Sequence, residues 1–450
     1  MSFPRYPKYK PSGVEWLKDV PEHWEVKPLC GCASERCESN KGMIEDNLLS
    51  LSYGRIVQKD MSSNDGLLPE SFETYQIVRR GDIVFRLTDL QNDKRSLRSA
   101  MVEEDGIITS AYLAVKPESA GSRFLAHLFR AYDATKVFYS MGGGLRQSMK
   151  YADVKRLPTL LPPPGEQTAI AAFLDRETAM IDGLVAEQRR LLELLKEKRQ
   201  AVISNAVTKG LNPRAPMKPS GIEWLGDVPE HWSENPLRAL FSLKHGYAFD
   251  SDHFSDSGEY VLMTPGNFYE WGGFRHKFPE KFYSGADFPR EFILESGQML
   301  VAMTEQGPGL LGSSLFVPDG ATYLHNQRLG RVHNIRCDKV NEKFLFHLFN
   351  SVRYRAEVAV SSTGAKVKHT SPQKILSVKV FLPPISEQKQ IGQFLDEEIT
   401  KTDLLEAEAQ RAIDLLQERR TALISAAVTG QIDVRDPSLN VRHPGGSVRA

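Results

Sequence analysis

The feature that most constrains this chain is an internal repeat. Residues 11–24 (PSGVEWLKDVPEHW) and 219–232 (PSGIEWLGDVPEHW) agree at 12 of 14 positions, at an offset of 208 residues. Residues 161–208 and 382–429 agree at 25 of 48 positions, at an offset of 221 residues. The segments between these blocks diverge, whereas duplication followed by simple drift would scatter the differences evenly. The pattern predicts two similar halves related by a pseudo-twofold axis, with related frames and different specificities.

Length and composition narrow the class of protein. The 450 residues suit two or three domains, and 41% hydrophobic with 25% charged residues is ordinary for a soluble globular protein. No apolar run approaches the ~20 residues of a spanning helix, and the start, MSFPRYPKYK, has no apolar signal core. Four cysteines fit a reducing compartment. We therefore expect a cytoplasmic protein, and its balanced charge excludes a globally basic nucleic-acid coat without excluding local basic faces.

The second repeated block predicts long helices over 166–209 and 387–430. Each follows a proline pair, has an acid in its first turn and ends near a glycine. Apolar residues recur at steps of three and four, which describes one packing stripe. Helices this long need a partner along most of their length, and each is the obvious partner of the other. We expect an antiparallel, coiled-coil-like spacer whose neutral or acidic surface does not face DNA.

These elements give an α+β fold with two similar globular domains joined by the two helices. The expected segments are a first recognition domain, a first spacer helix, a second recognition domain that starts with a linker at 210–232, a second spacer helix and a disordered tail: 1–165, 166–209, 210–386, 387–430 and 431–450.

Four windows within the variable segments are locally basic: 79–98, 141–160, 325–336 and 361–380. Lys and Arg neutralise phosphates, and Asn, Gln and Arg match base edges. Any one window is best explained as a solvated loop. Because they are paired across the two halves, nucleic-acid binding is the better interpretation of all four.

Motifs for catalysis are missing. The sequence has no GxxxxGK[ST] phosphate loop, no GxGxxG after a strand, no HExxH and no Asn-Pro-Pro-aromatic tetrapeptide. Cys30, Cys32 and Cys37 lack a nearby fourth ligand at zinc-ribbon spacing, so we expect no metal site. His23 and His231 lie in the repeated turn without a nearby nucleophile, which indicates packing or capping.

Three features together resemble the specificity subunit of type I restriction–modification systems. They are the P-S-G-[VI]-E-W-L-x-D-V-P-E-H-W motif, the helix start L-P-P-x-x-E-Q-x-x-I-x-x-F-L-D and the A-V-T-x-G-type helix end. The resemblance covers residues 5–430. It implies two target-recognition domains that each read one half of a split double-stranded DNA site. It also implies two methyltransferase subunits, which carry S-adenosylmethionine, and two restriction subunits, which use ATP and Mg, whereas the chain itself holds no cofactor and has no chemistry.

Residue type and loop position select candidates for DNA contact. In the first domain they are Arg86, Gln91, Lys94, Arg95, Arg98, Arg146, Gln147 and Lys150; in the second they are Gln306, Asn326, Gln327, Arg328, Arg331, Lys366, Lys368 and His369. The repeated helix starts are candidates for methyltransferase binding, through Glu166, Gln167, Asp175, Glu387, Gln388 and Asp396. They would equally recur if they only packed within the chain.

Two other functions remain open at this point. One is a single-chain DNA methyltransferase or nuclease, which the missing motifs disfavour. The other is a coiled-coil adaptor that never meets DNA. The sequence does not specify the recognised bases, the gap between half-sites or whether a restriction subunit exists.

Overall fold

The computed structural model describes residues 3–60, 71–88, 97–141, 148–269, 271–277, 279–285, 287–305, 309–364 and 367–435. The chain divides into two compact units: unit 1 comprises residues 1–188 and 411–450, and unit 2 comprises residues 189–410. The chain passes from unit 1 to unit 2 within helix α4 (Pro164–Lys209) and returns within helix α8 (Ile385–Val428). Among the described residues, no helix is both long enough and apolar enough to cross a bilayer.

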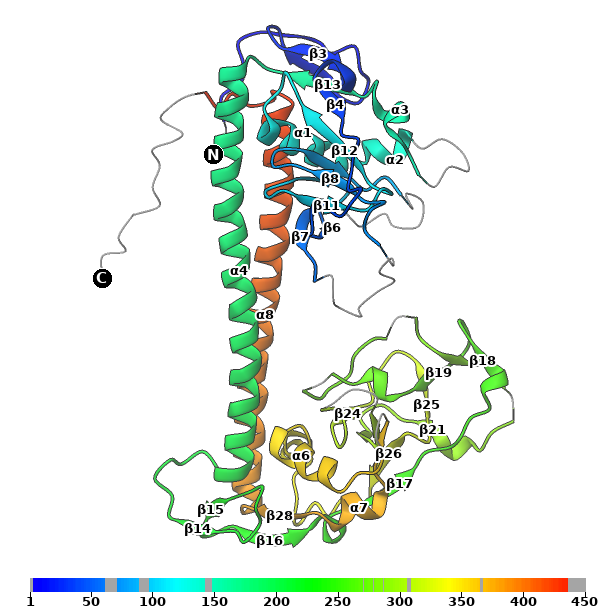
Figure 1. The fold of residues 1–450 in the computed structure, drawn as a ribbon. Helices are drawn as coiled ribbons and strands as arrows, with labels where there is room; N and C mark the ends of the chain where they lie inside the picture. The colour runs from blue at the N-terminus through cyan, green and yellow to red at the C-terminus, as the bar shows by residue number, and fades with distance from the viewer. Residues whose placement is uncertain are drawn as a thin grey trace. The chain divides into compact units, whose positions relative to one another are not determined.

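The two long helices pack antiparallel within each unit (Figure 1). In unit 1, the Arg420 guanidinium donates to both carboxylate oxygens of Asp182, at 2.9 and 3.2 Å. In unit 2, Arg199 pairs with Asp403 and with Glu406, the latter at 3.3 Å. Both the arginines and the aspartates are related by the repeat offset of 221 residues, so each helix donates the same arginine to the other. The predicted antiparallel pair is confirmed.

Unit 1 contains short strands and three short helices around one four-stranded sheet of order β10-β9-β12-β4. Phe85 of β9 packs edge-to-face on Phe129 of α1, with ring centroids 5.0 Å apart, so α1 covers one face of this sheet. The elements of unit 1 before α4 are β1 (Tyr9–Pro11), β2 (Asp19–Pro21), β3 (Glu25–Pro28), η1 (Leu29–Gly31), β4 (Ala33–Glu35), β5 (Glu38–Ser39), β6 (Leu49–Ser52), β7 (Arg55–Gln58), β8 (Gln76–Val78), β9 (Ile83–Phe85), β10 (Ser99–Met101), β11 (Gly106–Ile108), β12 (Leu113–Pro117), α1 (Ser122–Ala134), α2 (Val137–Met141), α3 (Tyr151–Val154) and β13 (Pro158–Leu161).

Unit 2 repeats this plan around a four-stranded sheet of order β24-β22-β26-β17, and its second sheet has five strands, of order β18-β20-β19-β25-β21, where the second sheet of unit 1 has three, of order β11-β8-β5. Phe316 of β24 stacks on Phe346 of α5 at 5.1 Å, so α5 takes the place of α1. Its elements between the long helices are β14 (Met217–Pro219), β15 (Asp227–Pro229), β16 (Ser233–Pro236), η2 (Leu237–Ala239), β17 (Ser242–His245), η3 (Ser251–His253), β18 (Phe254–Ser255), β19 (Tyr260–Met263), η4 (Pro265–Asn267), β20 (Phe282–Tyr283), η5 (Arg290–Phe292), β21 (Ile293–Leu294), β22 (Met299–Ala302), β23 (Thr304–Glu305), β24 (Ser314–Phe316), β25 (Thr322–His325), β26 (Leu329–His333), α5 (Glu342–Phe349), α6 (Val352–Val360), β27 (Lys368–His369), α7 (Pro372–Ser377) and β28 (Lys379–Leu382).

The second sheet of each unit has its own apolar core. In unit 2, Phe249, Leu262, Tyr283, Phe288 and Leu324 are buried together in it. In unit 1 the corresponding cluster is smaller, with Leu48, Phe72, Ile77 and Ile107.

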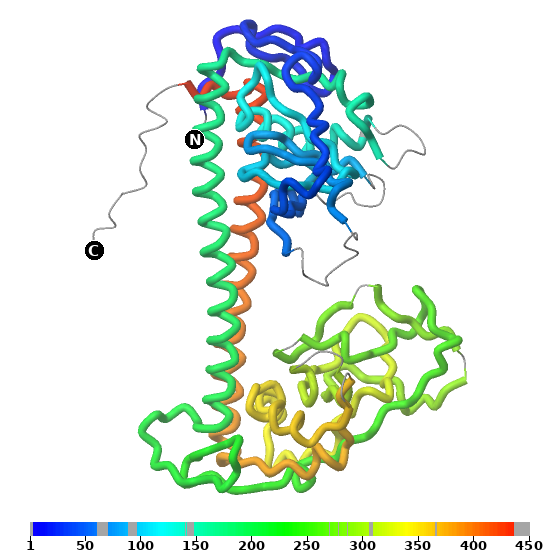
Figure 2. The backbone as a smooth tube through the Cα atoms, in the orientation of Figure 1, coloured from blue at the N-terminus to red at the C-terminus, as the bar shows by residue number. Residues whose placement is uncertain are grey.

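The end of α8 is tied to the start of the chain inside unit 1 (Figure 2). The main-chain N–H of Asp433 donates to the Pro4 carbonyl at 2.8 Å, and Val434 is buried. The Arg435 guanidinium lies 4.8 Å from the Tyr6 ring. The expectation of a disordered tail from 431 is therefore wrong for residues 431–435, which contact the first strand region, and residues 436–450 lie outside the described part of the chain.

Candidate nucleic-acid interface

In unit 1, two of the predicted basic windows meet just beyond the end of β9. Thr88 forms an antiparallel bridge with Ser148. The Met149 N–H donates to the Leu87 carbonyl at 2.9 Å. Lys150 follows directly, is exposed and stands at the N-cap of α3. We call this junction of residues 86–88, 97–99 and 148–150 the unit 1 foot. Here the chain leaves β9, enters β10 and approaches α3.

Of the eight DNA-contact candidates in unit 1, three lie among the described residues. Arg86 is half-buried, Lys150 is exposed and Arg98 is buried. The other five lie outside the described residues: Gln91, Lys94, Arg95, Arg146 and Gln147.

Arg98 does not face solvent, which corrects its prediction as a DNA contact. Its side chain has no exposed surface. The guanidinium donates to the Thr88 carbonyl at 2.8 Å and to the Tyr139 hydroxyl at 3.3 Å. Its own main-chain N–H donates to the Asp133 carboxylate. These bonds hold the end of β9, the start of β10 and helices α1 and α2 together on the buried side of the foot. Residue type alone did not reveal this, because burial depends on sequence-distant partners.

In unit 2, the equivalent junction is a short sheet formed by β23 and β27. Thr304 pairs with His369 and Glu305 pairs with Lys368. The Thr370 N–H donates to the main-chain carbonyl just before β23, as Met149 does after β9. We call this junction of residues 303–305, 309–313 and 367–371 the unit 2 foot.

The turn between β25 and β26 lies against this foot. The main-chain N–H of Met303 donates to the Arg328 carbonyl at 2.9 Å. Arg328 is exposed and Gln327 is half-buried, so both have side-chain surface at the foot. Asn326 is buried, and its Oδ1 accepts from the Arg328 N–H at 3.0 Å. Asn326 therefore shapes the turn, which corrects its prediction as a base contact.

The remaining unit 2 candidates differ in exposure. Lys368 is half-buried and His369 is exposed, with His369 Nδ1 3.1 Å from the Thr304 hydroxyl. Arg331 is half-buried within β26, and its guanidinium lies 3.5 Å from the Gln298 side-chain oxygen. Gln306 and Lys366 lie outside the described residues.

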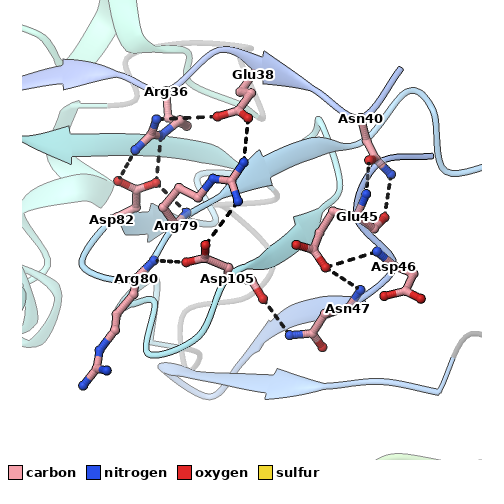
Figure 3. Close-up of polar contacts among 10 residues, drawn as sticks. All are labelled: Arg36, Glu38, Asn40, Glu45, Asp46, Asn47, Arg79, Arg80, Asp82 and Asp105. Carbon is pink, nitrogen blue, oxygen red and sulfur yellow. Dashed lines mark hydrogen bonds and ion pairs between the residues drawn. The ribbon is translucent and has the colours of Figure 1, made fainter. Parts of the chain in front are cut away.

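One basic residue of the 79–98 window, Arg79, is neutralised by acids near the start of β9 (Figure 3). Arg79 donates to Glu38 at 2.8 Å and to Asp105 at 3.1 Å. Arg36, which lies outside the window, donates to both oxygens of Asp82, at 2.8 and 3.0 Å. This network braces the sheet, so Arg79 offers less positive charge to a ligand than its residue type indicates.

Arg80 is a basic residue that our candidate set omitted. Its main-chain N–H donates to Asp105 at 2.8 Å, whereas its exposed side chain points away from the carboxylates in Figure 3. It lies at the start of β9, so it is not part of the unit 1 foot. Its place in the 79–98 window is the only sequence signal for it.

The repeated helix starts are used inside each unit. Glu166 accepts from the Trp24 indole N–H at 3.0 Å and lies 2.7 Å from His23 Nε2. Glu387 does the same in unit 2, with Trp232 at 3.3 Å and with the histidine of the same motif at 2.7 Å. Both indoles are fully buried. The acid in the first turn therefore connects the PSG[VI]EW motif to its helix.

The glutamine after each glutamate is also internal. Gln167 and Gln388 are buried, and each accepts a main-chain N–H from the start of the α1 or α5 region, at 2.7 and 2.8 Å. Asp175 lies 2.8 Å from His127, and Asp396 lies 2.9 Å from His347. In both pairs the histidine hydrogen bond holds the pKa of the carboxyl below its usual value. These contacts favour the alternative that the motif recurs because it packs within the chain.

The part of the chain that the structure describes contains no group of three or more His, Cys, Asp or Glu side chains arranged to hold a metal ion. Cys30, Cys32, Cys37 and Cys337 are free thiols, and burial raises the pKa of Cys32 to about 11. The Thr304 hydroxyl and His369 are the hydroxyl and histidine that the described part of the unit 2 foot brings into contact, 3.1 Å apart. The arrangement supplies cations and amides at two loop junctions, which suits binding.

Comparison with known proteins finds relatives that match between part and nearly all of the chain. Residues 229–413 match the family described as type I restriction modification DNA specificity domain. The type I restriction enzyme MjaVIII specificity subunit of Methanocaldococcus jannaschii is 23% identical over 286 residues, which cover 61% of this chain and 62% of that protein. A second protein of that organism, named for the MjaX specificity subunit, is 22% identical over 441 residues, covering 93% of this chain and 96% of its own length.

A solved structure shares the fold. It comes from work on complex assembly and conformational transition of the type I R-M system, and it aligns with 91% of this chain and 98% of its own. The TM-score is 0.61 at 17% sequence identity.

Proposed function

Because the chain belongs to the specificity subunits of type I restriction–modification systems, we propose that it reads a bipartite, asymmetric double-stranded DNA site, one half-site through each unit. The observation that carries this is the pair of feet. The unit 1 foot lies beyond β9 and the unit 2 foot beyond β22, which are equivalent inner strands of the two four-stranded sheets. The two feet nevertheless present different side chains. Equivalent geometry with different chemistry is what two readers of unlike half-sites require.

Division of labour between side chains follows from their exposure. Lys150 in unit 1 and Arg328 in unit 2 are exposed cations at the feet, suited to phosphate oxygens that set the register on DNA. Gln327 is half-buried beside Arg328, and an amide side chain is of the type that can match a base edge. Losing one phosphate contact should weaken binding to all sequences and reduce the salt slope by about 1.

A segment exchange tests the modular reading. Residues 25–160 are replaced with the corresponding segment of another specificity subunit, and the complex with the methyltransferase is expressed. Methylome sequencing should then show one changed half-site and one retained half-site, with the gap between them unchanged. Change in both half-sites, or in neither, would contradict the assignment of one unit to one half-site.

Chemistry is assigned to other subunits. Methyl transfer from S-adenosylmethionine to adenine, and cleavage driven by ATP and Mg, would reside on methyltransferase and restriction subunits, two of each, with none on this chain. The purified chain, incubated with labelled S-adenosylmethionine and DNA, should transfer no label. Turnover by the pure chain would favour a single-chain enzyme.

Salt dependence separates the reader from an adaptor that never meets DNA. Phosphate contacts release counterions, so the affinity of the assembled complex for DNA should fall steeply as salt increases. A complex whose gel shift is absent at low salt would favour the adaptor. The partners must be present, because a chain of zero net charge has little general attraction for DNA.

Exposed leucines on the helix pair suggest where two copies of one partner bind. Unit 1 exposes Leu184 and Leu415, at 53% and 55%, and unit 2 exposes Leu405 and Leu194, at 48% and 51%. Leu184 corresponds to Leu405, and Leu194 to Leu415, at the repeat offset of 221 residues. We infer one docking surface in each unit from these matched positions, since contiguous exposed apolar patches mark sites of protein–protein contact. This moves the expected methyltransferase contact away from the internally bonded glutamates and glutamines at the helix starts.

Stoichiometry tests this docking surface. The double substitution Leu184→Glu and Leu415→Glu should release one methyltransferase copy, because only the unit 1 surface changes. Native mass spectrometry counts the copies, and Glu187→Gln, an exposed position on the same helix, is the control. Retention of two copies by the double variant would place the partner elsewhere.

A further inference from the structure

We propose that Arg98 in unit 1 and Glu305 in unit 2 are positioning residues for DNA recognition. They would act without touching DNA, by fixing the feet that carry the DNA-contact candidates Lys150, in unit 1, and Lys368 and His369, in unit 2. This inference rests on the proposed function and adds to it the residues on which base discrimination depends.

Arg98 connects two parts of the unit 1 foot to each other and to helix α2. Its guanidinium bonds to the carbonyls of Thr88, at 2.8 Å, and Arg86, at 3.4 Å, and so joins the end of β9 to the start of β10. It also donates to the hydroxyl of Tyr139 in α2 and lies 5.6 Å from that ring. Because Thr88 bridges Ser148, the guanidinium is one contact away from the part of the foot that carries Lys150.

Glu305 performs the equivalent task in unit 2 with the opposite charge. One carboxylate oxygen accepts the main-chain N–H groups of Leu310 and Leu311, both at 2.8 Å. The backbone of Glu305 pairs with Lys368 in β27. Arg355 adds a bond to the Gly309 carbonyl at 2.5 Å, from a helix that packs beside the foot. The Glu305 carboxylate thus joins the end of β23 to residues 310–311, and the Glu305 backbone joins β23 to β27.

Burial makes these contacts hard to replace. Arg98 is 0% exposed and Glu305 is 4% exposed. A buried charge costs several kcal/mol unless fixed hydrogen-bonding groups compensate it, so each side chain is stable only with the loop ends in the observed arrangement. Specific recognition needs side chains held to within about 0.5 Å. A rigid foot is therefore required to hold the DNA-contact candidates on it in fixed positions.

The test uses the assembled complex with its methyltransferase and duplexes that each carry one altered base pair in one half-site. Arg98→Lys keeps the charge but cannot span two carbonyls and a hydroxyl. It should lower discrimination against altered base pairs by about tenfold in the half-site read by unit 1, which corresponds to one bidentate base contact. Discrimination in the other half-site should stay within about twofold, which serves as an internal control.

Glu305→Ala should give the mirror result, confined to the half-site read by unit 2. Glu305→Gln retains an oxygen acceptor and should recover most of the discrimination. Tyr139→Phe, which removes one bond from Arg98, is a milder variant should Arg98→Lys fail to fold. The matched control is Arg36→Lys, which disturbs another internal arginine of unit 1 and should lower the melting temperature without changing discrimination.

Three results would overturn the proposal. They are unchanged discrimination in a folded Arg98→Lys or Tyr139→Phe complex, equal loss in both half-sites, or a loss that Arg36→Lys reproduces at matched stability. A wild-type complex that methylates no bipartite site would instead contradict the proposed function, so the two failures are distinguishable.

Discussion

The feet of the two units solve one structural problem with opposite charges. Unit 1 closes its foot with a guanidinium that donates to carbonyls, and unit 2 closes its foot with a carboxylate that accepts from amides. The frames beneath them use the same residues at the same positions, as in the Trp24–Glu166 and Trp232–Glu387 pairs. The frame therefore tolerates new loops because their anchoring is solved locally, at the foot, without altering the interior that the two units share.

The largest expected effect tests whether the shared frame is equally important in both units. Trp24→Ala and Trp232→Ala each remove a fully buried indole and leave a glutamate without its N–H donor. Each should lower the free energy of unfolding of its own unit by about 3–5 kcal/mol. Hydrogen exchange followed unit by unit measures this loss. A large loss in one unit and a negligible loss in the other would break the equivalence of the frames.

Asp133 in unit 1 and His325 in unit 2 should contribute to the pH dependence of stability with opposite signs. Burial raises the pKa of the Asp133 carboxyl in unit 1 to about 6. An unfolded Asp titrates near ~3.9, so between these values the folded state holds the extra proton and unit 1 gains stability as pH falls. Burial lowers the pKa of His325 in unit 2 to about 4. An unfolded His titrates near ~6.5, so unit 2 loses stability as pH falls through that range.

Each titration is expected to change stability by no more than about 3 kcal/mol, at 1.36 kcal/mol for each pKa unit. Hydrogen-exchange protection in each unit, corrected for intrinsic rates between about pH 4 and 6.5, gives the two slopes. Asp133→Asn should flatten the slope of unit 1 alone, and His325→Gln that of unit 2 alone. Substitutions that leave both slopes unchanged, or that change them in the same direction, would contradict the prediction.

A smaller difference is expected at the ion pairs between the long helices. Arg199 has 3% of its side chain exposed and faces two acids, whereas Arg420 is 31% exposed and faces one. Arg199→Met should lower the free energy of unfolding by about 2 kcal/mol, because the largely buried Glu406 carboxylate loses its partner. The loss of the Asp403 pair adds little, because Asp403 is exposed. Arg420→Met should cost about 0.5 kcal/mol. Chemical denaturation of both variants checks the ranking, and equal costs would show that burial does not decide it.

The smallest effects concern the exposed cations that pair with the helix aspartates. Arg123 contacts Asp175 and Lys343 contacts Asp396, at 2.6 and 2.5 Å, and both cations are more than half exposed. Alanine at either position should cost about 0.5 kcal/mol or less, and high salt should remove the cost. A loss above 1 kcal/mol that persists in high salt would mean that the frame depends on these surface pairs.

Much of the architecture could be predicted from the chain itself. The repeat, the proline and glutamate before each apolar stripe and the glycine after it predicted two long antiparallel helices, and their observed bounds differ by two residues or fewer from 166–209 and 387–430. These are local signals, because helical periodicity and end residues act within a few turns.

Only the tertiary structure decided which polar residues of the basic windows face solvent. Arg98 and Lys150 are both cations in basic windows, yet one is buried and the other exposed, because Arg98 meets Thr88 and Tyr139 from other segments. Residues 431–435 likewise became ordered through contacts with residues near the start of the chain, more than 400 positions away. Periodicity describes neighbours along the chain, whereas burial of a charge depends on hydrogen-bonding groups that only folding brings together.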